Sequence, residues 1–438
     1  MKGVLRAVAL LLVVALIGGY VYARGSFQVA VGYSAKQLCS GVFVAGLPQS
    51  FVIETDIHPR MAILGPALGQ LKLDVNESGG VTEASLLGVS ARAVHRAGEG
   101  CVLHGSGDGI EPLPLMPTSD TVAVPAELTD AFSEAFKEPA GGGRNTLAVL
   151  VLKEGELIAE QYAAPVTAGN RLQAWSMNKS LMSTWVGLQT QAGAIDPTVP
   201  AREQVARVID GKRLDRRLTL LHLLQMESGL DFEEVYGPGS DVTRMLYTAE
   251  TMWELPAGAG QAYAPGQRFA YSSGDTVLAS HLWQESLDEP YYQWVEKNFS
   301  APLGIESLVA EADASGTQVG SSYAYMTARD WATAGQMWLD AWHGSSELLS
   351  QGWMRASSEA RPSDPKGQYG RGFWLNTGEV AFEGVPENVF YAAGNAGQFV
   401  VMVPEQELVV VRLGLTLAGT SSGISELLRA VLAAQGEG

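Results

Sequence analysis

Short runs rich in apolar residues, bounded by turn residues, predict strands near both ends of the region from residue 121 to the C-terminus. The predicted strands cover residues 146–153, 156–162, 389–393, 398–403 and 408–413. Between them, apolar residues recur at helical spacing, as in 218–226 and 275–285, and a further helix over 421–434 closes the chain. We therefore expect an α/β protein of the α+β type, with one antiparallel sheet flanked by helices and a helical lobe over about residues 190–345.

The first 23 residues differ from the rest of the chain. Lys2 and Arg6 precede an apolar run from Ala7 to Ala23, which is typical of a secretory leader or of a short membrane anchor. Both alternatives place the remaining chain outside the cytoplasm, in the periplasm or another extracytoplasmic space, because basic residues stay on the inner side. The second alternative would tether the protein to the inner membrane.

Residues 24–120 form a predicted accessory segment that ends in the proline-rich linker 111–117. The only two cysteines of the chain, Cys39 and Cys101, lie in this segment. In an exported protein such a pair predicts a disulfide. The alternative is a metal site that uses Cys101 and His104, but two thiols with scattered histidines make a poor ligand set, so we expect no metal.

The composition excludes several classes of partner. The 438 residues carry a net charge of −18, which disfavours nucleic acid and anionic lipid headgroups. A Walker-type phosphate loop and a dinucleotide fingerprint are both missing from the sequence, and we expect no cofactor. Nothing in the sequence indicates an oligomeric state.

The strongest chemical signal is the tetrapeptide Ser176-Met177-Asn178-Lys179 at the start of a helical pattern. Residues three apart share one helix face, so a desolvated lysine can take the proton of the serine hydroxyl. Burial and the positive helix end should lower the pKa of Lys179. The alternative is an N-cap serine followed by a solvated lysine. Residues 363–366 repeat the spacing, but Pro365 predicts a loop there.

A second serine motif spans residues 419–423 and matches the spacing of a nucleophile elbow. That chemistry needs a histidine further along the chain, whereas the last histidine is His343. We therefore interpret Ser421 and Ser422 as capping residues of the closing helix.

Two further stretches complete the candidate site. Tyr271 precedes Ser272-Ser273 at the start of a helix, and a lysine beside it would lower the pKa of its phenol and let it shuttle a proton. Residues 394–398 open a strand with small residues, so that the N–H groups of Gln398 and Ser176 would form an oxyanion hole. The alternatives are a capping segment with a core tyrosine and a simple glycine turn.

Together these stretches resemble the serine β-lactamase and penicillin-recognising superfamily over roughly residues 121–438. The resemblance is to the branch of class C β-lactamase-like esterases and 6-aminohexanoate-dimer-hydrolase-like amidases. It rests on three motifs in order and on a pocket loop, namely Ser176-Met177-Asn178-Lys179-Ser180, Tyr271-Ser272-Ser273, residues 394–398, and residues 227–232 with Tyr236.

The resemblance implies a β-lactamase/transpeptidase-like fold, with Ser176 as acylated nucleophile, Lys179 as base and Tyr271 as acid/base. It also implies that Tyr236, Asn395 and Gly397 contact the substrate. Asn395 stands where relatives often carry lysine or histidine, and Ser273 replaces a common asparagine. Loss of that cation disfavours substrates recognised through a carboxylate.

We therefore expect an exported serine hydrolase that cleaves a small ester or amide. One alternative is a penicillin-recognising D,D-carboxypeptidase or β-lactamase. The other is a binding protein of the same fold that has lost turnover.

Overall fold

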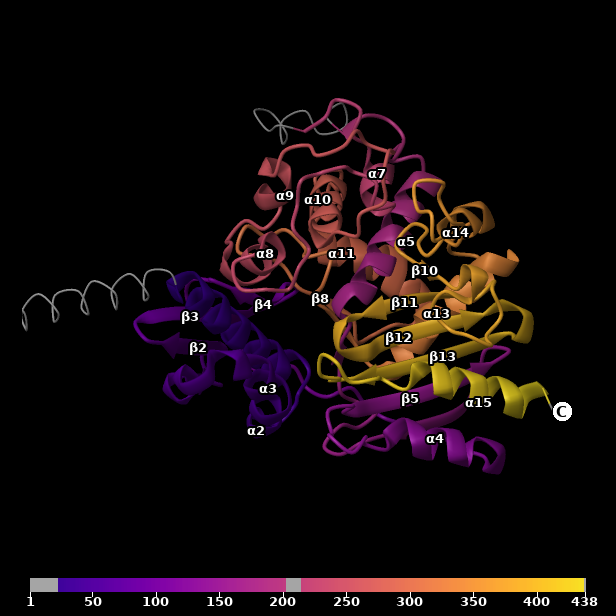
Figure 1. Cartoon of the computed structure of the whole chain (residues 1–438), viewed down its shortest axis with the longest axis horizontal. Coiled ribbons are helices and arrows are strands. Elements are labelled where there is room, and N and C mark those ends of the chain that lie inside the picture. The colour runs from indigo at the N-terminus through magenta and orange to yellow at the C-terminus, as the bar shows by residue number, and fades with distance from the viewer. Residues whose placement is uncertain (1–22, 202–213, 437–438) are drawn as a thin grey trace, which may run out of the picture.

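The computed structural model describes residues 23–201 and 214–436. Its centre is a six-stranded antiparallel sheet in the order β10-β11-β12-β13-β5-β6 (Figure 1). These strands are β5 (Thr146–Lys153), β6 (Glu156–Tyr162), β10 (Trp374–Leu375), β11 (Phe390–Gly394), β12 (Gln398–Val403) and β13 (Leu408–Gly414). The predicted α+β fold with one sheet built from both ends of the region is confirmed.

Helices cover both faces of this sheet. Since alternate residues of a strand point to opposite faces, neighbouring positions pack against different helices. Val400 and Val409 belong to the core beneath α13 (Ala328–His343). Val401 and Val410 belong to a separate core with α4 (Thr129–Phe136) and α15 (Ile424–Gly436). Because both faces are buried, these strands are continuous apolar runs.

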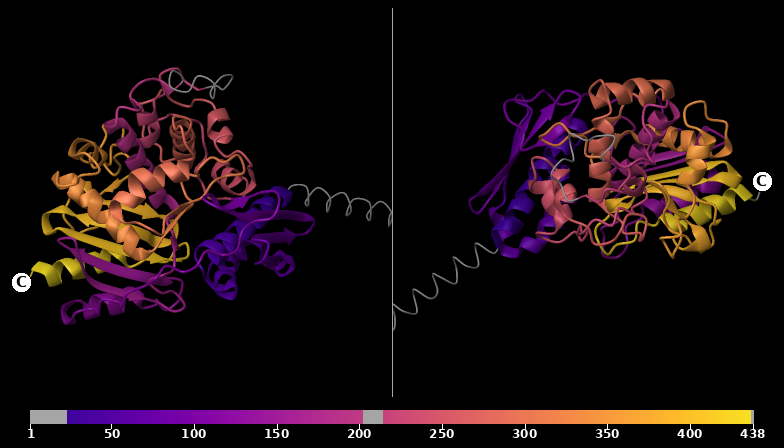
Figure 2. Two further views of the ribbon diagram at one scale, coloured as in Figure 1. Left: turned by 180° about the vertical axis from the view of Figure 1, so that it is seen from behind. Right: turned by 90° about the horizontal axis from the view of Figure 1, so that it is seen from above.

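The helical lobe lies beside the sheet, and α5 (Asn178–Gln191) lies between the two (Figures 1 and 2). Gly193, with φ +70°, follows the end of α5 and lets the chain turn away from the helix. The remaining labelled helices of this part are α7 (Leu220–Leu224), α8 (Asp241–Thr248), α9 (Glu254–Gly258), α10 (Ser273–Gln284), α11 (Tyr291–Val295), α12 (Ala301–Leu303) and α14 (Gln351–Ser357). A small sheet joins β7 (Leu172–Gln173), β9 (Ala324–Met326) and β8 (Val309–Ala310).

The accessory segment has a helical part and a sheet of its own (Figure 2). Residues 23–39 are helical, and short helical turns continue to residue 70, among them α2 (Gln49–Val52) and α3 (His58–Met61). An antiparallel sheet follows, made of β1 (Lys72–Asn76), β2 (Val81–Leu86), β3 (Val89–Arg96) and β4 (Gly100–Leu103). The segment packs closely on the rest of the chain, since a Cβ at Gly32 would lie 1.8 Å from the carbonyl oxygen of Tyr247 in α8.

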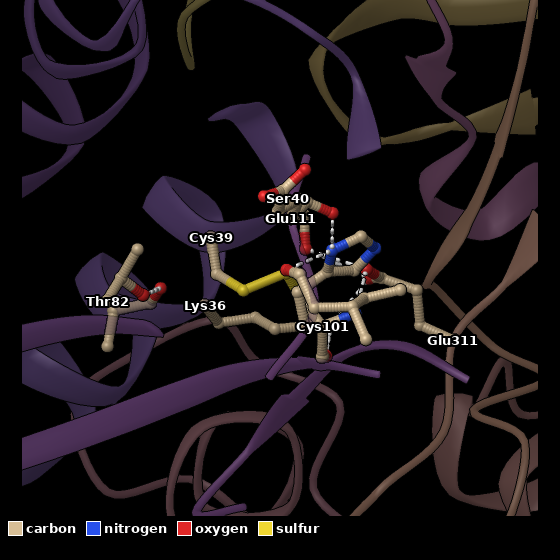
Figure 3. Close-up of a disulfide and its surroundings, with 10 residues drawn as sticks. Lys36, Cys39, Ser40, Thr82, Cys101, Glu111 and Glu311 are labelled. Atoms are coloured by element: carbon tan, nitrogen blue, oxygen red, sulfur yellow. Dashed lines mark hydrogen bonds and ion pairs between the residues drawn. A yellow bond between two sulfur atoms is a disulfide. The ribbon is translucent and has the colours of Figure 1, made fainter. Parts of the chain in front are cut away.

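A disulfide and a buried ion pair hold the accessory segment (Figure 3). Cys39 is bonded to Cys101, so the predicted disulfide is present and the alternative metal site at Cys101 and His104 is wrong. Beside it, the buried amine of Lys36 contacts the Glu311 carboxylate and the Cys101 carbonyl oxygen. Because Glu311 belongs to the region after residue 121, this ion pair joins the accessory segment to the rest of the chain.

The predicted leader or anchor lies almost wholly outside the described residues. Among residues 23–201 and 214–436, none of the helices combines the length and hydrophobicity needed to span a bilayer.

Candidate active site

Ser176 lies in a tight turn between β7 and α5. The turn is a 3₁₀ helix over Trp175–Met177, so α5 begins two residues after Ser176 rather than at it. Trp175 has φ +48°, a conformation that bulky residues rarely adopt. Its side chain is 2% exposed and packs in a core shared with the accessory segment, which holds the strained turn in place.

Lys179 contacts Ser176, as the spacing of three residues between them predicted. Its amine lies 3.1 Å from the Ser176 hydroxyl oxygen, 3.1 Å from the Ser273 hydroxyl oxygen and 3.2 Å from the Ser321 carbonyl oxygen. The side chain is 1% exposed, and this burial lowers the pKa of Lys179 to about 8, although Glu234 and Asp275 act in the opposite direction. A useful fraction of the amine is therefore neutral near physiological pH and able to accept a proton.

Tyr271 completes the cluster, because its hydroxyl shares a hydrogen bond with the Ser176 side chain. The Lys179 amine also lies 4.8 Å from the centre of the Tyr271 ring. The prediction that the lysine lowers the pKa of this phenol is wrong. Burial raises the pKa of Tyr271, and the hydrogen bond from Ser176 offsets only part of that effect. Tyr271 is accordingly protonated and neutral in the resting site.

The sequence interpretation missed Glu234. Its carboxylate accepts hydrogen bonds from the backbone N–H of Ser273 at 2.7 Å and from the Ser273 hydroxyl at 2.6 Å. Burial raises the pKa of Glu234, while the nearby Lys179 amine lowers it. Glu234 follows Glu233 in an acidic loop, which the sequence presents as an ordinary solvated surface, so no local signal marks it.

A second carboxylate, that of Asp275, also acts on Lys179. Asp275 is fully buried at the start of α10 and accepts a hydrogen bond from the Ser228 hydroxyl at 2.7 Å. Burial raises the pKa of Asp275 to about 7. Two carboxyl groups with elevated pKa values therefore influence the same lysine.

The third motif, residues 394–398, lies against the turn Trp175–Met177 that carries Ser176. A Cβ at Gly394 would lie 2.1 Å from the Ala174 carbonyl oxygen and 3.1 Å from the Ser176 nitrogen. The absence of a side chain at Gly394 therefore lets this motif lie close against the backbone of the nucleophile turn. The Gln398 side chain is buried and bonds both the N–H and the carbonyl of Gly414, so it stabilises the turn. The role of the Gln398 N–H in an oxyanion hole stays a prediction.

The three predicted substrate contacts separate into two groups. Tyr236, 49% exposed, and Asn395 line a cavity of about 600 Å³. Tyr236 also hydrogen-bonds Ser273, which connects this cavity to Lys179. Gly397 is not among the cavity's lining residues within the described chain. Its φ is +78°, and it packs against the Arg412 guanidinium, so it shapes the turn.

The competing motifs carry no comparable cluster. Residues 363–366 are loop, as expected. The Ser421 hydroxyl accepts a hydrogen bond from the Gly423 N–H in the turn directly before α15, so the capping role of Ser421 or Ser422 stays a prediction. Within the described residues, no group of three or more His, Cys, Asp or Glu side chains is arranged to hold a metal ion.

Comparison with known proteins finds a matching protein family and a related hydrolase. A family model described as Beta-lactamase matches residues 131–435. The 6-aminohexanoate-dimer hydrolase of Paenarthrobacter ureafaciens is 27% identical over 296 residues, which are 61% of this chain and 72% of that protein.

Solved structures share the fold at low identity. A family VIII carboxylesterase matches with a TM-score of 0.55 and 15% identity over 74% of this chain and all of its own. A penicillin-binding protein homologue from Caulobacter crescentus matches with a TM-score of 0.56 and 13% identity over 72% of this chain and all of its own. The family match covers most of the sequence, and the chain belongs to the β-lactamase family of serine hydrolases.

Proposed function

We propose that this protein is an exported hydrolase that cleaves a small ester or uncharged amide through an acyl-enzyme on Ser176. The observation that carries the proposal is the 3.1 Å contact between the Lys179 amine and the Ser176 hydroxyl, with Tyr271 on the same oxygen. A base and a proton donor on one alcohol are what a two-step acyl transfer requires.

In this mechanism the neutral Lys179 amine accepts the Ser176 proton as the oxygen attacks the substrate carbonyl. Tyr271 donates a proton to the leaving alcohol or amine and regains one from Lys179. The Ser176 N–H and a backbone N–H of the 394–398 turn stabilise the oxyanion, a contribution of about 3 kcal/mol for one donor. For deacylation the pKa values favour Lys179 as the base for water, since burial keeps the phenol protonated.

The test is pre-steady-state hydrolysis of p-nitrophenyl acetate. Wild type should release a burst of one p-nitrophenol per enzyme, with an acetyl group on the Ser176 peptide by mass spectrometry. Ser176→Ala should show neither, whereas Ser421→Ala, in the competing serine motif, should keep both. Burst and adduct in Ser176→Ala would refute the proposal.

The first rival is a D,D-carboxypeptidase or β-lactamase, in keeping with the penicillin-binding protein homologue among the fold relatives. Asn395 argues against it, because it supplies no cation for a substrate carboxylate. A fluorescent penicillin should label the protein weakly or not at all, and stoichiometric labelling would favour the rival.

The second rival is a binding protein without turnover. The complete set of Ser176, Lys179 and Tyr271 favours an enzyme instead. A fluorophosphonate probe should form an adduct on Ser176, and an unlabelled Ser176 would favour the binding protein.

Export is supported by the disulfide between Cys39 and Cys101, because such bonds persist in oxidising compartments. Fractionation of cells that produce the full chain should recover the protein outside the cytoplasm, either soluble or with the inner membrane.

A further inference from the structure

The cavity beside the candidate site is walled on one side by the accessory segment. Its lining comes from the helix over residues 23–39, from α3 and the following turn, from the loop that begins at Tyr236, from α8, and from Asn395 and residues 417–418. The aliphatic side chains among its lining residues include Val29, Ala30, Met61, Ile63, Leu64 and Leu417. Ile63 is 76% exposed and has little packing of its own.

Ser176, Lys179 and Tyr271 are not among the described residues that line this cavity, but two of its lining residues lead to them. Tyr236 lines it and hydrogen-bonds Ser273, whose hydroxyl lies 3.1 Å from the Lys179 amine. Asn395 also lines it and directly follows Gly394, which lies against the Ser176 nitrogen. A substrate whose carbonyl reaches Ser176 would therefore extend one end into the cavity.

The charge of the lining argues against an ionic ligand. Among the described residues that line the cavity, Arg60 alone has a charged side chain. Its Nε donates to the Asp56 carboxylate at 2.5 Å, and Asp56 also accepts a hydrogen bond from Tyr33. Since Asp56 already neutralises this guanidinium, the cavity offers apolar surface rather than a free charge.

From this arrangement we infer that the accessory segment builds a specificity pocket for a hydrocarbon chain of the ester or amide substrate. The inference rests on the proposed function and extends it, because it names the substrate class as an uncharged molecule with an aliphatic chain next to the scissile bond. The driving force is the removal of that chain from water against the apolar wall.

The experiment measures kcat/KM on p-nitrophenyl esters from acetate to octanoate, and on alkyl acetates from ethyl to octyl. In wild type, at least one series should rise with chain length, by up to about fourfold per buried methylene. Val29→Trp fills the cavity and should lower kcat/KM for the longest substrates by about tenfold or more, while the acetate ester is hydrolysed as before. Gln28→Trp, on the neighbouring exposed position of the same helix, is the matched control and should leave both series unchanged.

A second pair of variants removes apolar surface without filling the cavity. Ile63→Ser should weaken the chain-length dependence, whereas Val380→Ser, at an exposed apolar residue away from the cavity lining, should not. Thermal unfolding checks that all four variants fold.

Two outcomes would overturn the inference. One is that both series are flat in wild type or unaffected by Val29→Trp. The other is that p-nitrophenyl glutarate, whose chain ends in a carboxylate, is preferred over the pentanoate. In both cases a Ser176-dependent burst with acetate would leave the proposed function standing, whereas loss of that burst would remove the proposed function itself.

Discussion

Glu234 holds Ser273 by two hydrogen bonds, to its backbone N–H and to its hydroxyl, at 2.7 and 2.6 Å. Ser273 in turn accepts a hydrogen bond from the Lys179 amine. A carboxylate is thereby placed one side chain away from the candidate base, where its charge opposes the effect of burial on the pKa of Lys179.

This arrangement predicts the pH dependence of ester hydrolysis. Lys179 acts as a base only when neutral, so kcat/KM should rise with pH and level off above about pH 8. Asp275 also faces this amine, and its ionisation near pH 7 raises the pKa of Lys179 rather than lowering it.

Glu234→Gln should move that rise to lower pH, because it removes a charge that raises the pKa of Lys179. Glu233→Gln, at the neighbouring exposed carboxylate, is the control and should leave the profile in place. A profile that moves to higher pH in Glu234→Gln would contradict the assigned role of Lys179.

Tyr271→Phe should reduce kcat by about 10²- to 10⁴-fold, because the hydroxyl that meets Ser176 is lost while the ring remains. The comparison variant is Tyr263→Phe, whose exposed hydroxyl pairs with Arg268 away from the cluster and should be dispensable. Near-normal turnover in Tyr271→Phe would exclude the phenol from proton transfer.

Gly394→Ala should abolish most activity. The added methyl group would collide with the Ala174 carbonyl oxygen and press on the Ser176 nitrogen, so the nucleophile turn must shift. Gly258→Ala provides the control, since a Cβ there has no neighbour within 4 Å. Burst kinetics report the result, and equal bursts in both variants would show that the turn tolerates displacement.

The Lys36–Glu311 ion pair predicts a stability effect. Lys36→Met leaves a buried carboxylate without its cation and should lower the free energy of unfolding by about 3–5 kcal/mol. The double variant Lys36→Met/Glu311→Leu should recover much of that loss. Lys137→Met, which breaks an exposed pair with Glu134, should cost about 0–1 kcal/mol in the same urea titration. A Lys36→Met variant as stable as wild type would mean that the pair does not hold the segment.

Local patterns predicted the parts of this protein that depend on neighbouring residues. The strands β5, β6 and β12 occur with the predicted bounds, because the apolar runs and the turn residues that delimit them are local features of the sequence. The contact of Ser176 with Lys179 follows from helical geometry over three residues.

Features that depend on distant contacts were missed or wrong. Glu234 reaches Ser273 across 39 positions, and no spacing rule indicates that contact. The direction of the Tyr271 pKa shift depends on how deeply the phenol is buried, which only the assembled structure reveals. The accessory sheet was missed because its inward positions include small residues such as Ala84, Ala91 and Ala93, which carry a weak hydrophobic signal.

Trp175, the residue before the nucleophile, is buried among side chains of the accessory segment. The family match begins at residue 131, so the matched region alone lacks the accessory side chains that pack in the same core as Trp175. A truncated enzyme cut at that boundary would expose an indole and release the turn beside its own nucleophile. A transplant of this catalyst should therefore include the accessory segment, residues 24–120.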